Sequence, residues 1–366
     1  MKESSMNIVT KNESFFNNYS SKLLEENLKT VDLQNQFYSL QFINHYLAAL
    51  GRKLHFGTNP KVFGQLIELE NKLASLHIDT NLNYDLYVSY NNHKAAHALM
   101  LGRAREAFNY TQQVVNYFEK TKGLIQIHER NYSQVILHLH ARKANLQSTT
   151  QSLDDLEKMF KKLIKHTTLP LSRDLELYIR SEYIQRKYNY LGILGESDKQ
   201  EKFLNQHMQY IKEFKQQLTD TYFIWLNYSK ALGHLVNNEF QKGYDDLIKL
   251  FDKNIRLPNK LLLQVNLIEL ILLLELNEKK LLVNRIRSAA RLFGQLDPNL
   301  SSAKSAIKYF RQSVGKRYSS NQESVMIKNI LSELAAATQS YLGESLFQQQ
   351  TGIVRWLENR SARIVH

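Results

Sequence analysis

Apolar side chains recur every three to four residues along nearly the whole chain. Leu66, Leu69 and Leu73 follow this spacing in one stretch, and Leu156 and Phe160 follow it in another, with lysines on the opposite side. Such a period places the apolar residues on one face of an amphipathic helix. Runs that alternate apolar and polar residues between glycine or Asn-Gly turns do not occur in the sequence. The pattern predicts an all-α fold.

Turn-like positions interrupt the helical pattern at intervals of roughly 40 to 50 residues, close to the period of helix-pair repeats. They lie near Gly51, Gly102, Gln147–Thr150, Gly195, Asn237–Asn238, Asn277 and Gly315. A second set of breaks lies between them, at Pro170, Pro258 and Pro298, because proline cannot continue a helix. Two interleaved sets of breaks predict a chain of antiparallel helix hairpins, one set closing each pair and the other joining successive pairs.

The composition agrees with this interpretation. Apolar residues make up 43% of the chain, enough for a sizeable core, while only 13 glycines and 4 prolines are present. Folds rich in strands need more turn residues than that. There is no cysteine, which excludes disulfides, cysteine–zinc sites and thiol chemistry and suits a reducing compartment.

Two of the predicted hairpins carry pairs of small residues. Ala107 follows Ala95 by twelve residues, and Gly243 follows Ala231 by twelve, in each case across a predicted turn. Small side chains let two antiparallel helices approach closely near their shared turn. In these hairpins the sequence resembles the tetratricopeptide-repeat (TPR) family. The stretch Tyr222–Phe293, notably Leu281–Phe293, is similar to the closing portion of uncharacterised TPR-type proteins of bacteria. The resemblance implies a right-handed α-solenoid of degenerate repeats that binds proteins through its groove, and it brings no known activity.

The chain divides into three parts on this interpretation. Residues 1–13 are polar and we expect them to be disordered, residues 14–343 form the TPR-like array, and residues 344–366 form a capping helix and tail. Within the last part, a helix over about Glu344–Asn359 is predicted to cover the apolar face of the last hairpin. No linker rich in proline, glycine and serine separates domains, so one continuous array is predicted.

One apolar stretch, Leu257–Leu276, has the length of a membrane span but contains Lys260, Glu269 and Glu275. An ionised glutamate in the middle of a lipid bilayer is costly, whereas a central helix packed on both sides explains the same pattern. The segment Met1–Thr10 lacks the basic and apolar runs of a signal peptide. We therefore expect a cytoplasmic protein with no membrane span.

Candidate chemistry is sparse. His93 and His97 have the helical spacing at which two imidazoles can share a metal, but Lys94 lies between them and no glutamate does. The sequence contains no glycine-rich phosphate loop and no G-x-S-x-G motif. We therefore expect a non-enzymatic protein without catalytic residues, metal or cofactor, although an active site assembled from scattered residues would leave no signature.

The leading functional hypothesis follows from the predicted groove. The first helices of successive hairpins would line it and hold a peptide or protein segment. Near the clearest repeat, the candidate partner-binding residues are Tyr87, Asn91 and Lys94.

A basic region supports an alternative. The net charge is +13, and the segment 279–320 contains ten basic residues against one acidic residue, Asp297. The basic residues are Lys279, Lys280, Arg285, Arg287, Arg291, Lys304, Lys308, Arg311, Lys316 and Arg317. Arg287 with Arg291, and Lys304 with Lys308 and Arg311, form two stripes on helix faces. Such stripes can neutralise phosphates or acidic side chains, so nucleic acid is the alternative partner.

Tyr309 and Phe310 lie within the second stripe. Exposed aromatic rings there would stack on the bases of a single-stranded nucleic acid. Phe310 could equally be the residue that anchors its helix in the core.

Overall fold

The computed structural model describes residues 34–51, 60–75, 84–121, 123–165, 173–216, 218, 220–251, 257–315 and 318–365. All regular structure in these ranges is helical, which confirms the predicted all-α class. Residues 34–51 form a first helical segment. The predicted disordered segment, residues 1–13, lies outside the described residues.

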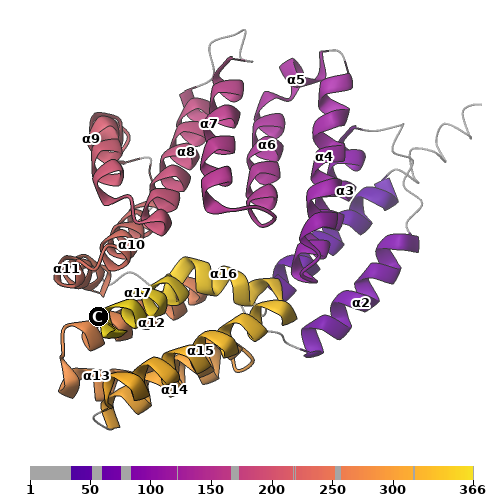
Figure 1. The fold of residues 1–366 in the computed structure, drawn as a ribbon. Helices are drawn as coiled ribbons and strands as arrows, with labels where there is room; N and C mark the ends of the chain where they lie inside the picture. Colours follow the sequence, from indigo (N-terminus) through magenta and orange to yellow (C-terminus); the bar gives the residue numbers. More distant parts are fainter. Residues whose placement is uncertain are drawn as a thin grey trace, which may run out of the picture.

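Sixteen further helices follow in the described part of the chain (Figure 1). They are α2 (Pro60–Ser75), α3 (Tyr84–Met100), α4 (Ala104–Lys120), α5 (Leu124–Ile127), α6 (Glu129–Ala144), α7 (Thr149–Lys165), α8 (Arg173–Leu194), α9 (Ser197–Glu213), α10 (Asp220–Val236), α11 (Phe240–Phe251), α12 (Asn259–Glu275), α13 (Lys279–Leu296), α14 (Ser301–Gly315), α15 (Ser320–Ser340), α16 (Leu342–Thr351) and α17 (Ile353–Val365).

Consecutive helices pack in pairs: α3 with α4, α6 with α7, α8 with α9, α10 with α11, α12 with α13, and α14 with α15. Several predicted breaks coincide with the turns inside these pairs. Gly102, Gly195, Asn238 and Asn277 have left-handed backbone conformations there, which glycine and asparagine adopt more readily than other residues. The prolines mark connections instead, since Pro258 precedes α12 and Pro298 lies between α13 and α14. Pro170 lies outside the described residues.

The small-residue pairs lie where the paired helices approach most closely. Ala95 and Ala107 are fully buried between α3 and α4. In the α10–α11 pair, a Cβ atom at Gly243 would lie 3.3 Å from the carbonyl oxygen of Ala231 and 3.2 Å from Leu272. A larger side chain at position 243 would therefore push α11 away from α10.

The apolar stretch that could be mistaken for a membrane span is the central helix α12. Eleven of its residues are buried, including Gln264 and Glu269. It packs against α11, α13, α14 and α16, so that it has neighbours on several sides. The prediction of a buried helix is confirmed. In the described part of the chain, no helix combines the length and apolar character needed to cross a bilayer.

The C-terminal residues form two helices rather than the single helix predicted over residues 344–359. Gly352 separates α16 from α17, in a left-handed conformation that closes α16. A Cβ atom at Gly352 would lie 3.1 Å from Leu232 of α10, so the bend is packed directly on that helix. The bend lets α17 follow a new direction, which one straight helix could not do.

The C-terminal segment also contacts hairpins other than the last one. The residue before α16, Tyr341, donates a hydrogen bond to the carbonyl oxygen of Met100, at 3.1 Å, and its ring packs edge-on against Phe63. The predicted cap over the last hairpin alone is therefore too limited. The C-terminal segment contacts the first described hairpin as well.

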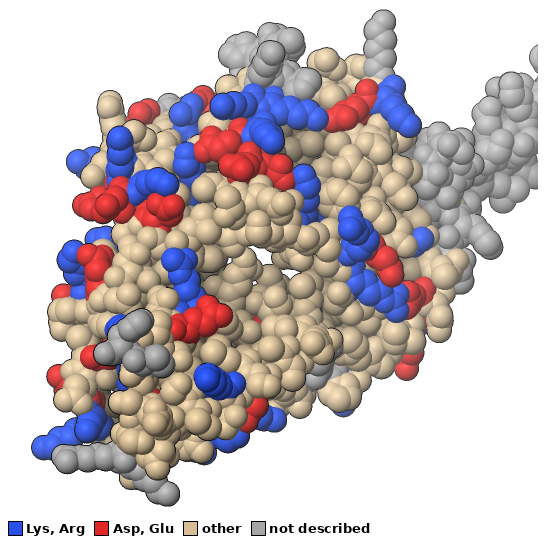
Figure 2. Space-filling model, in the orientation of Figure 1, with Lys and Arg blue, Asp and Glu red and all other residues tan. Residues whose placement is uncertain are grey.

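Contacts with the intervening hairpins complete this arrangement. Gln349 donates to Thr149 Oγ1 at 2.9 Å, and Arg355 donates to the carbonyl oxygen of Ile193 at 3.2 Å. Figure 1 shows α3 to α10 in an arc, with the turns inside the helix pairs, such as the α6–α7 turn, on the side of α16 and α17. Figure 2 shows a small opening between this arc and the C-terminal helices. The chain of hairpins is thus closed by its own last two helices.

Candidate functional site

A groove lies between α3 and α6, next to the first helical segment. Its volume is about 460 Å³. It is lined by Phe37, Asp85, Val88, Ser89, Asn92, Asn131, Gln134, Val135 and His138. The lining residues of α3, and likewise those of α6, recur at i, i+3, i+4 and i+7, so each set lies on one helix face. Two parallel rows of side chains therefore form the walls.

Carboxamide side chains dominate the polar part of this groove. Asn92 lies on α3, and Asn131 and Gln134 lie on α6. The buried Oδ1 atom of Asn92 has no hydrogen-bond partner among the described residues. A buried polar atom without a partner is destabilising, so such an atom at a recess indicates a place where a ligand can donate a hydrogen bond. Asn131 uses its Nδ2 atom to donate to Tyr84 Oη at 3.1 Å, which orients its amide.

His138 is the titratable residue at the inner end of the α6 row. Although its side chain is exposed, desolvation within the recess lowers its pKa, and the nearby cations Arg142 and Arg186 lower it further. Glu182, which forms an ion pair with Arg186 at 2.9 Å, acts in the opposite direction. We therefore expect a neutral imidazole at pH 7, able to donate from one nitrogen and accept at the other.

The partner-binding residues predicted from the sequence lie elsewhere on α3. Tyr87 and Lys94 are two and nine residues from Asp85, which at about 100° per residue is the opposite helix face. Tyr87 stacks near Tyr117 of α4, with 4.4 Å between ring centroids. Lys94 lies over the ring of Tyr110, also on α4. Both residues therefore pack toward the second helix of the hairpin rather than toward the groove.

The third predicted residue, Asn91, is buried. Its Nδ2 atom donates to the carbonyl oxygen of Tyr87 at 2.9 Å. The neighbouring residue, Asn92, occupies the position in the groove. The sequence signal that could have identified the groove is the polar row Asp85, Ser89 and Asn92, which follows helical spacing within a helix that has no clear apolar face.

The basic residues of α13 and α14 that the structure describes are exposed. Lys316 and Arg317 lie outside the described residues. Arg285 pairs with the buried Glu269 of α12 at 3.0 Å, and Lys308 pairs with Glu333 of α15 at 2.5 Å. Within the described ranges, the remaining basic residues of these helices form no ion pair: Lys279, Lys280, Arg287, Arg291, Lys304 and Arg311. Arg285 faces α12, so it lies apart from the two stripes.

The aromatic residues within the second stripe do not face solvent. Tyr309 is 1% exposed and Phe310 is fully buried, and both rings pack against Trp356 of α17. Neither ring can stack on a nucleic-acid base. This removes the aromatic part of the nucleic-acid hypothesis and leaves only its electrostatic part.

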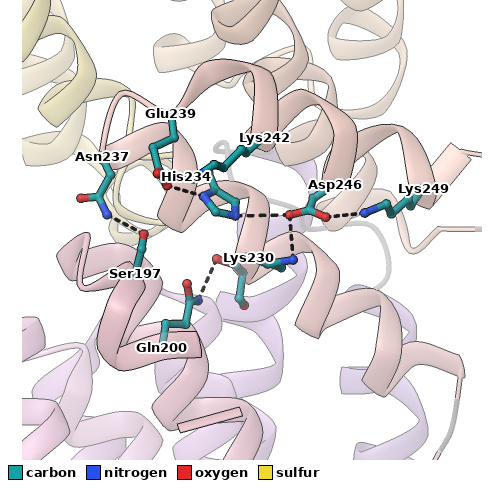
Figure 3. Close-up of polar contacts among 10 residues, drawn as sticks. Ser197, Gln200, Lys230, His234, Asn237, Glu239, Lys242, Asp246 and Lys249 are labelled. Atoms are coloured by element: carbon teal, nitrogen blue, oxygen red, sulfur yellow. Dashed lines mark hydrogen bonds and ion pairs between the residues drawn. The ribbon is translucent and has the colours of Figure 1, made fainter. Parts of the chain in front are cut away.

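A second polar constellation surrounds His234 at the α10–α11 turn (Figure 3). His234 Nδ1 lies 2.6 Å from Glu239 Oε2, and its Nε2 atom lies 3.4 Å from Asp246 Oδ2. Lys230 and Lys249 also contact Asp246, at 3.3 Å and 2.7 Å. The imidazole therefore lies between the carboxylates of Glu239 and Asp246, and lysine side chains also contact these carboxylates.

The protonation states in this cluster follow from those contacts. The hydrogen bond to Asp246 raises the pKa of His234, with Glu239 acting in the same direction and burial opposing both. Burial alone would raise the pKa of Asp246, but the hydrogen bonds from His234 and Lys249 outweigh it and lower that pKa. Each charged group at the centre of the cluster has a partner of opposite charge. The cluster therefore ties α11 to α10, and we assign it a structural role.

The histidines that suggested a metal are bonded to main-chain oxygens. His97 Nε2 lies 2.7 Å from the carbonyl oxygen of Leu66, and His93 Nδ1 contacts the carbonyl oxygen of Ser89. Burial lowers the pKa of His93. Among the described residues, no group of three histidine or acidic side chains is arranged to hold a metal ion.

A scan against protein-family models, a search of curated proteins and a search of solved structures each returned no match. The resemblance to the TPR family therefore stays a prediction from the two hairpins that carry the small-residue pairs.

Proposed function

We propose that the protein is a non-enzymatic scaffold of TPR-like, degenerate helix-pair repeats that binds a peptide or an extended segment of a protein. The α3–α6 groove is the binding site in this proposal. A peptide group offers one donor and one acceptor, and a carboxamide can satisfy both at once. A row of carboxamides along a groove therefore suits a peptide main chain better than a single charged ligand.

The observation that carries the proposal is the unpartnered, buried Oδ1 atom of Asn92 at the groove wall. Val88 and Val135 add apolar surface on the same walls, on which a side chain of the peptide could rest. The volume of about 460 Å³ is sufficient for a few residues of an extended chain.

Peptide retention tests this proposal. A tryptic digest of a whole-cell proteome is passed over the immobilised protein, and the retained peptides are identified by mass spectrometry. Replacing both Asn92 and Asn131 by Ala is expected to reduce retention at least about tenfold, since each lost buried hydrogen bond is worth about 1 kcal/mol. The matched control is Asn284→Ala, at an exposed position of α13. Equal retention by the double variant and the wild-type protein would contradict the proposal.

A stability measurement separates binding from folding. Because Asn92 Oδ1 has no described partner, we expect Asn92→Leu to leave the free energy of unfolding unchanged or to raise it slightly. The same variant is expected to lose peptide retention. If Asn92 had only a structural role, Asn92→Leu would instead lower the free energy of unfolding.

A further inference from the structure

A second groove lies between α13 and α14, outside the α3–α6 groove. Its volume is about 260 Å³. The floor is mainly apolar and is made of Phe293, Leu300, Ala303 and Ile307, and the lining also includes Pro298 and the buried Asp297. All four side chains belong to the core or its edge, so the floor is rigidly held. An apolar recess that is open to solvent is a place where a bulky apolar side chain of a partner gains by being buried.

The two walls of this groove differ. Ala290 and Gly294 form the α13 wall, and a Cβ atom at Gly294 would meet nothing within 4 Å. The absence of side chains there leaves room for another backbone to approach. Lys304, Lys308 and Arg311 form the α14 wall and line the same recess. The stripe that the sequence predicts on this helix is thus one side of a groove.

The other stripe, Arg287 and Arg291, lies at the outer edge of the α13 wall. Arg287 precedes Ala290 by three residues, and Arg291 precedes Gly294 by three, so each arginine is a neighbour of a wall residue on the helix surface. Within the described ranges, Arg287, Arg291, Lys304 and Arg311 form no ion pair. The apolar floor is therefore bordered on both sides by cations, and of those described only Lys308 is held in an ion pair.

We propose that the α13–α14 groove docks an acidic amphipathic helix of a protein partner. A helix lies along the groove between two antiparallel helices and places apolar side chains at i, i+3 or i+4, and i+7 into it. Acidic residues on its flanks then meet the basic side chains of both walls. A nucleic-acid backbone would meet the cations but would leave the apolar recess unfilled, and Tyr309 and Phe310 are buried beneath. The observations therefore favour a peptide helix over a phosphate chain.

The test separates the recess from the charge. Peptides of 16 residues are selected by phage display on the full chain, and the selected sequences are measured as labelled peptides by fluorescence anisotropy. Gly294→Phe places a bulky side chain at the recess while keeping every cation, and its Cβ atom would meet nothing within 4 Å. Gly64→Phe is the matched control, because Gly64 is also an exposed helical glycine whose Cβ would meet nothing within 4 Å.

The expected result has three parts. Selected peptides are acidic, with bulky apolar residues at helical spacing. Gly294→Phe weakens their binding at least about tenfold, the effect of blocking a central anchor, whereas Gly64→Phe has no effect. Replacing Arg287, Arg291, Lys304 and Arg311 by Gln also weakens binding and removes most of its salt dependence.

Two outcomes would overturn the inference. One is a selection that yields no peptide whose binding depends on Gly294. The other is binding of labelled single-stranded RNA, duplex DNA or anionic vesicles that is lost in the Gln variant but unchanged in Gly294→Phe, while peptides fail to bind. That second result would identify the surface as an electrostatic site for polyanions. The α3–α6 groove takes no part in this test.

Discussion

The α3–α6 groove and the α13–α14 groove arise from the same architecture but offer different chemistry. In both, a recess forms between helices of successive hairpins, and residues at helical spacing line the walls. Carboxamides, Asp85 and His138 line the polar part of the first, whereas cations border an apolar floor in the second. Recognition in a helix-pair array thus depends on which residue types occupy four or five positions of two helices. The pairing of the helices says little about the ligand.

The two grooves also differ in how they are supported. The C-terminal helices pack directly on α12, α14 and α15, so the α13–α14 groove rests on the largest apolar core. The α3–α6 groove meets the C-terminal segment mainly through Tyr341 and Gln349, at the turns. Substitutions in the C-terminal segment should therefore destabilise the helices of the α13–α14 groove more than those of the α3–α6 groove. The first three of the four predictions below test this difference.

The largest effect is expected from Trp356→Ala. Trp356 is 2% exposed, packs on Tyr309 and Phe310, and donates from Nε1 to Glu275 at 2.8 Å. Removing a buried tryptophan costs about 3–5 kcal/mol of unfolding free energy, which urea denaturation would measure. Trp225, the other tryptophan, is only partly buried, so Trp225→Ala is the control and should cost less. Both tryptophans pack against the same apolar core, so equal losses would contradict the larger contribution expected from the buried Trp356.

A smaller and more local effect is expected from Glu344→Gln. The buried Glu344 carboxylate accepts hydrogen bonds from the main-chain nitrogens of Ser301 and Ser302, at 2.6 Å and 3.0 Å. It therefore caps the start of α14, where the helix dipole favours a negative charge. The change should cost about 2 kcal/mol, since charge-assisted hydrogen bonds are lost. Hydrogen exchange should speed up in α14 but not in α6, and faster exchange in both helices would contradict the expected locality.

Tyr341→Phe removes a single hydrogen bond between the ends of the array. Its ring contact with Phe63 stays, but the donor to Met100 is lost. We expect a loss of about 1 kcal/mol, the usual worth of one neutral hydrogen bond. Hydrogen exchange at the end of α3 and in α2 should quicken, with α14 unchanged. Faster hydrogen exchange in α14 as well would mean that losing this hydrogen bond destabilises the helices of both grooves together.

The smallest effect concerns pH and the His234 cluster. Since the pKa of His234 is raised in the folded protein, its protonation stabilises the fold below pH 6.5, its ordinary pKa, and this contribution is lost as pH rises through the raised value. The contribution should be below about 1 kcal/mol, the range of partly exposed ion pairs. Urea midpoints measured between pH 5.5 and pH 8.5 should fall slightly in the wild type. The midpoints should fall less in His234→Gln. An identical dependence of the midpoint on pH in both proteins would exclude a contribution from protonation of His234.

The helical pattern predicted much of the fold. The all-α class, the buried helix α12 and several turns follow from apolar spacing and from glycine, asparagine and proline positions, which act over a few residues. The path of the C-terminal helices does not follow from such local signals. It depends on contacts such as that of Tyr341 with Met100, two residues that are 241 positions apart in the sequence. The bend at Gly352 is likewise visible in sequence only as one glycine among 13.

The positions of the two grooves follow from the sequence only in part. The α13–α14 stripes are visible in the sequence because charge runs are local. To predict the apolar floor between the stripes, one would have to know that α13 and α14 lie side by side. In α3, Tyr87 and Lys94 lie about half a turn from the face that lines the α3–α6 groove. Leu86, Ala95 and Ala98 are buried on different sides of this helix and leave no clear apolar face from which to orient it. The bridge between α8 and α10 made by buried Gln200 also has no sequence signal.

The contacts of α16 and α17 restrict how this chain can change in length. An open repeat array can gain or lose a repeat at little cost, because each repeat contacts only its neighbours. Here a duplicated or deleted hairpin would shift Met100, Thr149 or Ile193 away from Tyr341, Gln349 and Arg355, which contact them now. The number of hairpins is thus fixed by the reach of two terminal helices, and variation in this chain should accumulate as substitutions within the helix pairs.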